Sequence, residues 1–345
     1  MEQLSQGKNI YSRISRKRRV VLALSAAAVL ALIAVDLSVG SSGLTFARCV
    51  RLLLDGPGGR STYALIVWQV RLPMTLTCAG VGCCLALAGL QVQTITNNPL
   101  SSPYTLGISS GASFGAAIAI VTGLTVCGVQ WIGTALTAFL FALAVTAMIF
   151  LLGKRKRMSP QTLVLVGVIM NFFFSALQQY LQYRASAEIA QIIANWSFGN
   201  LSRASWTSAA VSLAAALFGA LFFAGLGWQL TAFNAGEERA QSLGVPVEGL
   251  KRKTFLVSSL LVASAVGFIG TVGFVGLVAP HCARLLVGED QRYLMPVSAL
   301  FGMLLLLLAS TVSKLLTQGA MLPVGIVTSL VGVPFLLILL MKEAS

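Results

Sequence analysis

The longest uncharged stretch of this chain limits its fold more than any other feature. From Leu72 through Gly153, 82 consecutive residues contain no Asp, Glu, Lys, Arg or His. A membrane-spanning helix needs about 20 predominantly apolar residues, so this stretch alone has room for three helices and their turns. A soluble chain carries about 25% charged residues, whereas this chain of 345 residues carries 10%. The sequence therefore predicts an all-α polytopic membrane protein.

Apolar length and helix breakers predict about ten membrane-spanning helices. We expect them at residues 20–40, 68–93, 105–124, 129–152, 160–183, 206–230, 253–269, 273–288, 295–315 and 323–342. With this arrangement, seventeen of the 24 Lys and Arg residues fall on the side of the N-terminus and seven on the other side. Because basic loops stay in the cytoplasm, both the N- and C-termini are predicted to be cytoplasmic.

The remaining segments are short. Residues 1–19 are predicted to be a cytoplasmic basic N-terminal tail, and residues 20–342 a single transmembrane domain. Its main cytoplasmic loop covers residues 235–253, where two short helical segments are expected to flank the break at Gly244-Val245-Pro246. Since no soluble domain of useful size is left, a large partner must be a separate chain.

The net charge of +14 could indicate nucleic-acid binding, but the distribution of the basic residues along the chain argues against it. Basic residues cluster in short segments between apolar runs, at 17–19, 154–157 and 251–253. This pattern is typical of cytoplasmic loops beside a lipid bilayer. The bilayer is therefore an expected partner, and nucleic acid is not.

Residues for common chemistries are missing from the sequence. No Gly-x-x-x-x-Gly-Lys-Ser/Thr phosphate loop occurs, so the chain cannot bind ATP by that route. His281 is the only histidine, and the six cysteines have no metal-ligand spacing. Zinc sites and Ser-His-Asp triads need more such residues. We expect no catalytic residue, no metal site and no cofactor, and the protein is not predicted to be an enzyme.

Acidic residues are scarce in the predicted spans, where Asp36 is the only carboxylate at membrane depth. Proton- and sodium-coupled carriers usually hold buried carboxylates or histidines as relay groups. This scarcity makes an ion-coupled secondary transporter the second choice and indicates that energy comes from elsewhere. An intramembrane enzyme is a third alternative, disfavoured because no metal or nucleophile group is present.

The fifth predicted span carries a polar stripe on one helical face. Its members stand at i, i+4, i+7 and i+11, namely Asn171, Ser175, Gln178 and Gln182. Amides exposed to lipid would leave polar groups unpaired in hydrocarbon. Two alternatives remain open, namely hydrogen bonds between packed helices and a water-accessible transport pathway.

Five ordered sequence blocks resemble a known family. Trp68-Gln69-Val70-Arg71-Leu72-Pro73 comes first, followed by Asn98-Pro99-Leu100 with Leu106–Ala112, then Leu243-Gly244-Val245. The last two blocks are Gly273–Arg284, with Pro280, His281 and Arg284, and Leu322–Thr328, with Pro323 and Gly325. In this order and spacing the chain resembles the permeases of bacterial ABC importers for iron–siderophore complexes, haem and vitamin B12.

The resemblance implies a permease subunit that forms the translocation pathway as a homo- or heterodimer in the plasma (inner) membrane. Two cytoplasmic ABC ATPase subunits and an extracytoplasmic substrate-binding protein would be its partners. A ferric siderophore is the first expected substrate, with haem or cobalamin as alternatives. In the family the loop between the sixth and seventh helices contacts the ATPase, which here implies a coupling role for Glu237, Glu238, Arg239, Leu243, Gly244 and Arg252. The alternative is a charge run that is only solvated.

The resemblance also implies a docking role for two outer basic residues. Arg60 and Lys314 match positions that pair with glutamates of the binding protein, although a lone Lys314 could instead extend to the membrane interface. Three residues depart from the family pattern: Met74 for arginine, Ser310 for aspartate and Met321 for glutamate. These losses suggest that contacts within the subunit are rearranged, and our hypothesis is that the chain is one half of a heterodimer.

Overall fold

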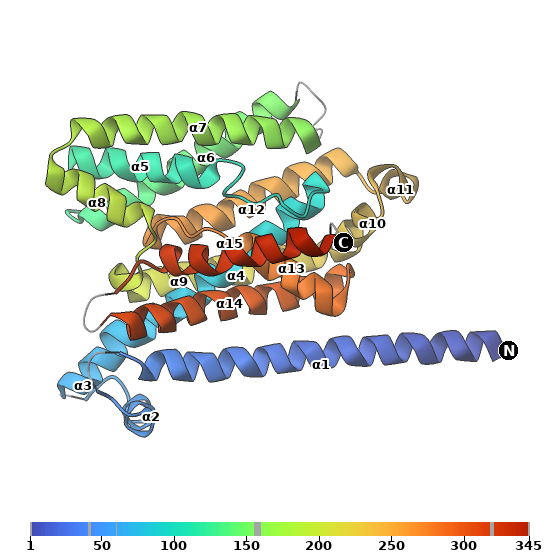
Figure 1. Cartoon of the computed structure of the whole chain (residues 1–345), viewed down its shortest axis with the longest axis horizontal. Helices are drawn as coiled ribbons and strands as arrows, with labels where there is room; N and C mark the ends of the chain where they lie inside the picture. The colour runs from blue at the N-terminus through green and yellow to red at the C-terminus, as the bar shows by residue number, and fades with distance from the viewer. Residues whose placement is uncertain (1, 41–42, 60, 155–159, 318–320, 344–345) are drawn as a thin grey trace.

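The protein is all-helical in the residues that the computed structural model describes, which are 2–40, 43–59, 61–154, 160–317 and 321–343. Within these ranges no β-strand is found, and the long helices lie side by side in one bundle (Figure 1). The prediction of an all-α fold is confirmed.

Among the described residues, seven helices are long and apolar enough to cross a membrane. One of these candidate spans is a continuous helix made of α3 (Thr62–Leu65), the π-helix η1 (Ile66–Arg71) and α4 (Leu72–Thr96). The other six lie in α1 (Glu2–Ser38), α6 (Gln130–Lys154), α7 (Pro160–Arg184), α9 (Trp206–Gly225), α12 (Val247–Ile269) and α14 (Gln291–Leu316). Three further helices of the described chain are also apolar, but their apolar segments are shorter. They are α5 (Ile108–Thr122), α13 (Val275–Val287) and α15 (Val324–Glu343). Each of these ten helices overlaps one of the predicted spans.

The helix α4 lies at the centre and is buried along almost its whole length. It approaches α14 and α13 closely because glycines meet at both crossings. A methyl group added to Gly82 would lie 2.4 Å from the carbonyl oxygen of Gly302, and one added to Gly89 would lie 1.7 Å from that of Gly276. Small residues let membrane helices pack backbone against backbone. These two glycine crossings fix α4, α13 and α14 together.

The helix α5 is too short to span the hydrocarbon by itself. Its 15 residues rise only about 22 Å, against about 30 Å of hydrocarbon. The chain before α5 has no helical structure, and Ser101, Ser102 and Leu106 in it are buried. Such burial is what irregular backbone inside a membrane would need.

A second irregular segment, residues 270–274, separates α12 from α13. Gly270 has a φ of 82° and Phe274 a φ of 68°, and an aromatic residue with positive φ is rare. The hydroxyl of Thr271 donates to the carbonyl oxygen of Ser197 at 2.5 Å. This contact holds residues 270–274 against the end of α8.

Shorter helices occupy two of the connections between the predicted spans. They are α2 (Phe46–Leu54), α8 (Ala187–Ser197) and the 3₁₀ turn η2 (Leu201–Arg203). Ser186 caps α8 by accepting a hydrogen bond from the backbone N–H of Ile189, as serine commonly does at a helix start. Hydrogen bonds from the backbone N–H of Glu188 and from Ser186 lower the pKa of the exposed Glu188 carboxyl.

The helix α1 is continuous from Glu2 to Ser38, so no break separates the predicted basic tail from the first span, and the cytoplasmic position of the tail stays a prediction. One predicted boundary was wrong. The predicted span 206–230 breaks at Leu226, where α9 ends and α10 (Gly227–Asn234) begins. Leu226 has non-helical backbone angles and stands between two glycines, which are the residues least able to keep a helix straight.

The two ends of the bundle carry different elements (Figure 1). One end holds α10 and α11 (Glu237–Ser242), together with the start of α1 and the end of α15. We call it the α11 end. The other end holds α2, α3 and α8, and we call it the α8 end. If the predicted orientation holds, the α11 end faces the cytoplasm.

Candidate functional site

The loop predicted at residues 235–253 contains one short helix and the first turns of α12. Gly236 begins α11 with a φ of 115°, and Gly244 turns the chain after it with a φ of 81°. Side chains with a Cβ rarely adopt either conformation. Glu237 and Glu238 lie in the first turn of α11, where carboxylates complement the helix dipole. The expected second short helix is the start of α12, which begins at Val247.

A buried lysine ties α11 to α12. The Nζ of Lys251 lies 2.7 Å from Oε2 of Glu237, and its side chain is 2% exposed while that of Glu237 is 41% exposed. The same ammonium lies 5.7 Å from the ring centre of Phe233 in α10. Lys251 thus links all three helices of the segment. Our sequence prediction chose Arg252 and missed Lys251, although Lys251 shares its helix face with the apolar Phe255.

The other predicted coupling residues lie on the surface of the α11 end. All of them are exposed, namely Glu238, Arg239, Leu243, Gly244 and Arg252. Beneath them, Ala240, Val245 and Leu250 are buried. The segment is therefore anchored from below and presents both charges and an apolar side chain outward.

Arg284 connects the bundle to residues 235–253, which we call the coupling segment after the role that the sequence predicts for it. Its Nη1 donates to Oε1 of Gln93 in α4 at 3.2 Å, and its Nε lies 2.8 Å from Oε1 of Glu289 in the turn between α13 and α14. The amide of Asn234, at the end of α10, donates to Oε2 of Glu289 at 3.2 Å. A chain of polar contacts thus runs from α4 to the start of the coupling segment.

Buried amides continue this network behind Arg284. The side-chain amide of Gln91 donates to Oε1 of Gln291 at 3.4 Å. Gln291 donates from its side chain to the Thr94 hydroxyl at 3.1 Å and from its backbone to the Thr231 hydroxyl at 3.2 Å. Gln91 and Gln291 are both fully buried. Since buried amides are costly without partners, the network specifies how α4, α10 and α14 fit together.

Other predicted motif residues shape turns or packing. Pro280 is buried inside α13, and the half-buried ring of His281 meets Phe335 of α15 edge-on at 5.9 Å between ring centres. After α4, the side chain of Asn98 accepts a hydrogen bond from the backbone of Leu100 at 2.9 Å. Pro99 lies inside this turn, as expected for an Asx turn.

The polar stripe of α7 meets α5 and α8. The hydroxyl of Ser110 donates to the side-chain oxygen of Asn171. Gln178 donates to the hydroxyl of Ser197 at 2.8 Å, and Gln182 donates to the carbonyl oxygen of Ala190 at 3.1 Å. Ser175 is half-buried on the same helix. These contacts correspond to the packing alternative that we left open.

Unlike the polar stripe, the exposed side chains of α7 are mainly aromatic and aliphatic. They include Leu165, Ile169, Phe172, Phe173, Tyr180 and Tyr183. On α15 the exposed side chains are also apolar and include Leu330, Val331, Leu337 and Met341. Both surfaces are suited to lipid or to another membrane subunit.

A buried ion pair lies toward the α8 end. The Nζ of Lys314 lies 2.8 Å from Oδ2 of Asp36, and the two side chains are 5% and 0% exposed. Thr75 and Thr311 donate hydrogen bonds to the same carboxylate at 2.6 and 3.2 Å. Docking of Lys314 to a binding protein would require this ion pair to open. The other predicted docking residue, Arg60, lies outside the described residues.

Arg71 reinforces this junction between α1 and α4. Its Nη1 donates to the carbonyl oxygens of Leu37 at 2.7 Å and Ser38 at 2.9 Å, at the end of α1. Pro73 follows in the first turn of α4 and is buried, inside the continuous helix that begins at α3, where its ring nitrogen cannot donate a helical hydrogen bond. The motif that contains these two residues therefore lies where α1 meets the start of α4.

The last motif closes the bundle beside α8. The backbone N–H of Gly325 donates to the carbonyl oxygen of Phe198 at 3.1 Å. A Cβ on Gly325 would lie 2.3 Å from that oxygen, so only glycine fits. Pro323 precedes α15 and is half-buried. Residues 198, 271 and 325 thus meet at one point of the α8 end.

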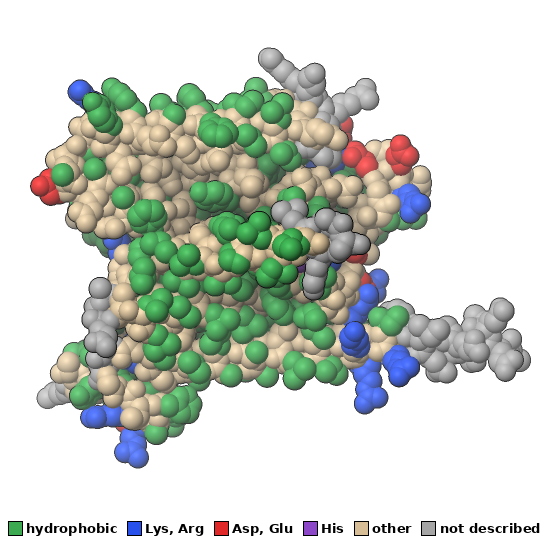
Figure 2. Space-filling model, viewed as in Figure 1, with side chains coloured by type: hydrophobic (Ala, Val, Ile, Leu, Met, Phe, Trp, Pro, Cys, Tyr) green, Lys and Arg blue, Asp and Glu red, His purple; other side chains and the backbone are tan. Residues whose placement is uncertain are grey.

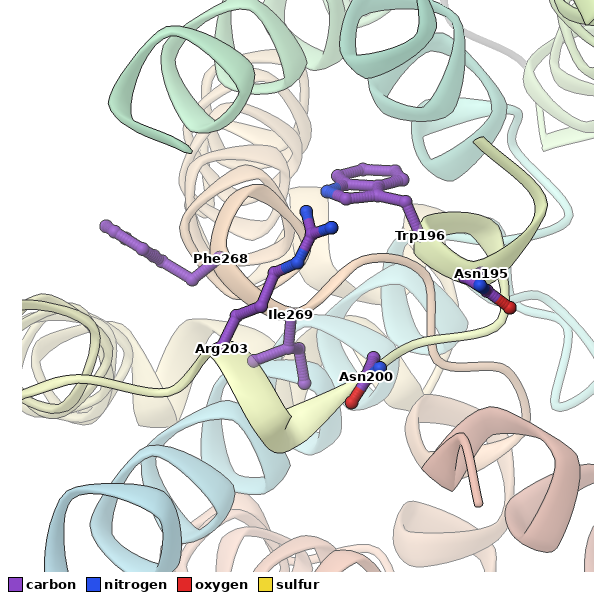
Figure 3. A pocket seen from close by; sticks show the side chains of 6 residues that line it. All are labelled: Asn195, Trp196, Asn200, Arg203, Phe268 and Ile269. Atoms are coloured by element: carbon purple, nitrogen blue, oxygen red, sulfur yellow. The ribbon is translucent and has the colours of Figure 1, made fainter. Parts of the chain in front are cut away.

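A small hollow with a volume of about 20 Å³ lies at the same end (Figure 3). Its lining comes from α8, η2 and α12, with Asn195, Trp196, Asn200, Arg203, Phe268 and Ile269. The Arg203 side chain extends toward Trp196 (Figure 3). The hollow is too small for a metal chelate of siderophore size, because drug-sized ligands need about 300 Å³ or more.

No metal-binding group is found among the described residues, since no three His, Cys, Asp or Glu side chains are grouped to hold an ion.

Comparison with known proteins identifies the family. Residues 27–342 match the FecCD transport family. The chain is 36% identical over 298 residues to the cobalamin import permease BtuC of Halobacterium salinarum, covering 86% of this chain and 78% of that protein. It is 34% identical over 279 residues to the hemin transport permease HmuU of Yersinia pestis, covering 80% of this chain and 84% of that protein.

A solved structure is also similar over nearly its whole length. It is described as an inward-facing metal-chelate type ABC transporter, with a TM-score of 0.83 and 30% sequence identity over 94% of this chain and 99% of that one. The chain belongs to the FecCD transport family, the multi-pass inner-membrane permeases of ABC importers for iron–siderophore complexes, haem and vitamin B12.

Proposed function

We propose that this chain is the permease subunit of an ATP-driven importer for an iron complex, with a ferric siderophore as the first candidate. The geometry of the α11 end carries the proposal. There α11 is fixed from below by Lys251 and leaves Glu238, Arg239 and Arg252 exposed. A short, rigidly held helix with outward charges is suited to receive motion from another protein.

In this proposal the chain crosses the membrane ten times with both termini in the cytoplasm, and it forms the pathway as a dimer. Two separate ATPase subunits contact the α11 end, and a substrate-binding protein delivers the complex at the α8 end. ATP binding changes the relative stability of two conformations of the dimer, so no covalent chemistry is needed in this chain. Contacts from Arg284 to Glu289 and Gln93 offer a route between the coupling segment and α4.

The buried acid supports ATP-driven transport over the ion-coupled alternative. Asp36 is held by the Lys314 ammonium and two hydroxyls. In the described part of the spans this carboxylate is taken up by contacts between helices, whereas ion-coupled carriers usually hold relay carboxylates along their pathway. The pathway role of Asn171, Ser175, Gln178 and Gln182 stays a prediction, because their described contacts support packing.

Charge reversal at the coupling segment tests the proposal. Uptake of a radiolabelled ferric siderophore is measured in cells that lack this chain and receive wild type or R239E/R252E. We expect wild type to restore uptake and the variant to lose most of it, because its reversed charges would face the ATPase surface. The experiment is repeated with labelled haem and cobalamin to identify the substrate.

A binding assay separates coupling from damage. Solubilised wild type should retain its ATPase subunit, R239E/R252E should not, and R48E/R51E at the α8 end should retain it as wild type does. If uptake survives R239E/R252E but is abolished by a protonophore while ATP stays constant, the chain is an ion-coupled carrier instead.

A further inference from the structure

Four cations surround α1 at the α11 end. Arg13, Arg16, Lys17 and Arg19 are all exposed and lie within seven residues, about two helical turns. We call these four residues the basic collar. Among the residues whose side chains the structure describes, none forms an ion pair with the collar. The import function described above does not use it.

The collar has a fixed position because its neighbours attach α1 to the bundle. Arg18 lies 3.1 Å from Asp290, and its guanidinium is 5.4 Å from the ring centre of Tyr293. The hydroxyls of Ser15 and Tyr293 are 2.9 Å apart. Arg18 and Ser15 therefore face α14, while the collar residues point into the surroundings of the helix.

The surface directly beyond the collar is apolar. Val20, Leu24 and Leu30 are exposed on α1, in the helix segment long and apolar enough to cross a membrane. Figure 2 shows Lys and Arg side chains gathered where α1 leaves the rest of the molecule, beside hydrophobic side chains along the bundle. A partner that covers this surface must be anionic at one end and apolar along the rest.

We propose that the basic collar binds the phosphate groups of anionic phospholipids, whose acyl chains lie along Val20 and Leu24. An acidic face of a cytoplasmic protein or a nucleic acid would match only the cations. Three of the four cations are arginines, whose forked guanidinium can bind a phosphate through two hydrogen bonds. Cationic residues next to the end of a membrane span are attracted to anionic headgroups over about a Debye length.

The test uses the full-length chain in nanodiscs of phosphatidylcholine alone or mixed with phosphatidylglycerol. Retained phosphatidylglycerol is counted by native mass spectrometry, and the thermal midpoint is measured in both lipids. R13Q/R16Q/K17Q/R19Q removes the collar, and R13K/R16K/R19K keeps its charge. The matched control R48Q/R51Q/R184Q/R203Q removes four exposed cations at the α8 end.

We expect phosphatidylglycerol to be retained by wild type and to raise its thermal midpoint, and both effects should weaken at high salt. The lysine variant should retain the lipid more weakly than wild type, because it keeps the charge and loses the fork of arginine. The glutamine variant should bind the lipid at least about tenfold more weakly than wild type, since each nearby cation contributes to headgroup attraction. The control should keep the retained lipid of wild type.

Three results would overturn the proposal. The glutamine variant could retain as much phosphatidylglycerol as wild type. The α8-end control could lose as much lipid as the collar variant, which would indicate a general effect of charge. Finally, the collar variant could lose its ATPase subunit in phosphatidylcholine while its lipid retention stays unchanged, which would make the collar a protein contact.

Discussion

At the scale of single residues, Asp36 and Lys314 form the contact with the largest expected effect on stability. Both side chains are almost completely buried, and the ammonium also donates to the backbone oxygen of Asp36 at 2.9 Å. A charge buried in a protein is costly once its partner is removed. The pair holds α1 against α14, because Asp36 and Lys314 lie near the same end of these two helices.

Removal of one partner should therefore cost more than removal of both. D36N leaves the Lys314 ammonium without its anion, and we expect the free energy of unfolding to fall by about 3–5 kcal/mol. The double variant D36N/K314M should recover most of that loss, because no unpaired charge is left. Unfolding in mixed micelles measures both values.

Glu289 supplies the control for this experiment. Its carboxylate pairs with Arg284 but is 56% exposed, so E289Q should cost at most about 1 kcal/mol. If D36N is as mild as E289Q, or if the double variant is no better than D36N, the ion pair does not stabilise the fold as argued here.

Several of these residues could not be found from the sequence. Asp36 was recognised as the one acid at membrane depth, but its partner lies 278 positions along the chain and nothing local connects them. Lys251 was hidden in a run of three basic residues, and only its helix face distinguishes it. Predictions from sequence find which residue types are unusual, whereas pairs between distant helices need the packed structure.

At the scale of elements, the coupling segment depends on Lys251. Its ammonium lies between Glu237 of α11 and Phe233 of α10. The apolar contacts of Ala240 and Leu250 are independent of this charge. Loss of the ammonium should therefore loosen α11 without unfolding the bundle.

We expect K251M to lower transport and transport-linked ATP hydrolysis on the order of tenfold, which corresponds to about 1.4 kcal/mol of lost coupling. R292M, which removes an exposed cation at the start of α14, should keep both rates. The exchange E237K/K251E restores an ion pair and should recover part of the activity. An unchanged rate in K251M, or no recovery in the exchange, would show that the bridge does not position α11.

Helix positions were predicted well where length and polarity set them. The helices α6, α7, α12 and α14 each overlap the predicted segment, because each is a long apolar run between polar breaks. The error at the end of α9 has a local cause, because the apolar character of residues 225–227 hid the break between two glycines.

At the scale of the whole molecule, large apolar surfaces remain on α7 and α15. Phe172, Phe173 and Tyr183 are exposed on α7, and Leu337 and Met341 on α15. A second permease subunit would cover such surfaces in the proposed dimer. The hydroxyl of Ser310 is buried without a hydrogen-bond partner in the described part of the chain, at the position where the family pattern leads us to expect an aspartate.

These observations lead to a prediction for assembly. The chain expressed alone should remain mostly monomeric and bind its ATPase weakly, whereas co-expression with a second permease subunit should give a stable dimer that binds ATPase. Light scattering after size-exclusion chromatography measures the mass of each species. A stable homodimer of this chain that retains ATPase would reject the heterodimer hypothesis.

The glycine crossings of α4 also limit how such a permease can evolve. Because Gly82 and Gly89 touch backbone rather than side chains, no neighbouring side chain can shrink to make room for a larger residue there. A single mutation at either position would need two helices to separate at once. Adaptation to a new cargo is therefore expected through the exposed faces of α7 and α15, while the centre of the bundle stays unchanged during divergence.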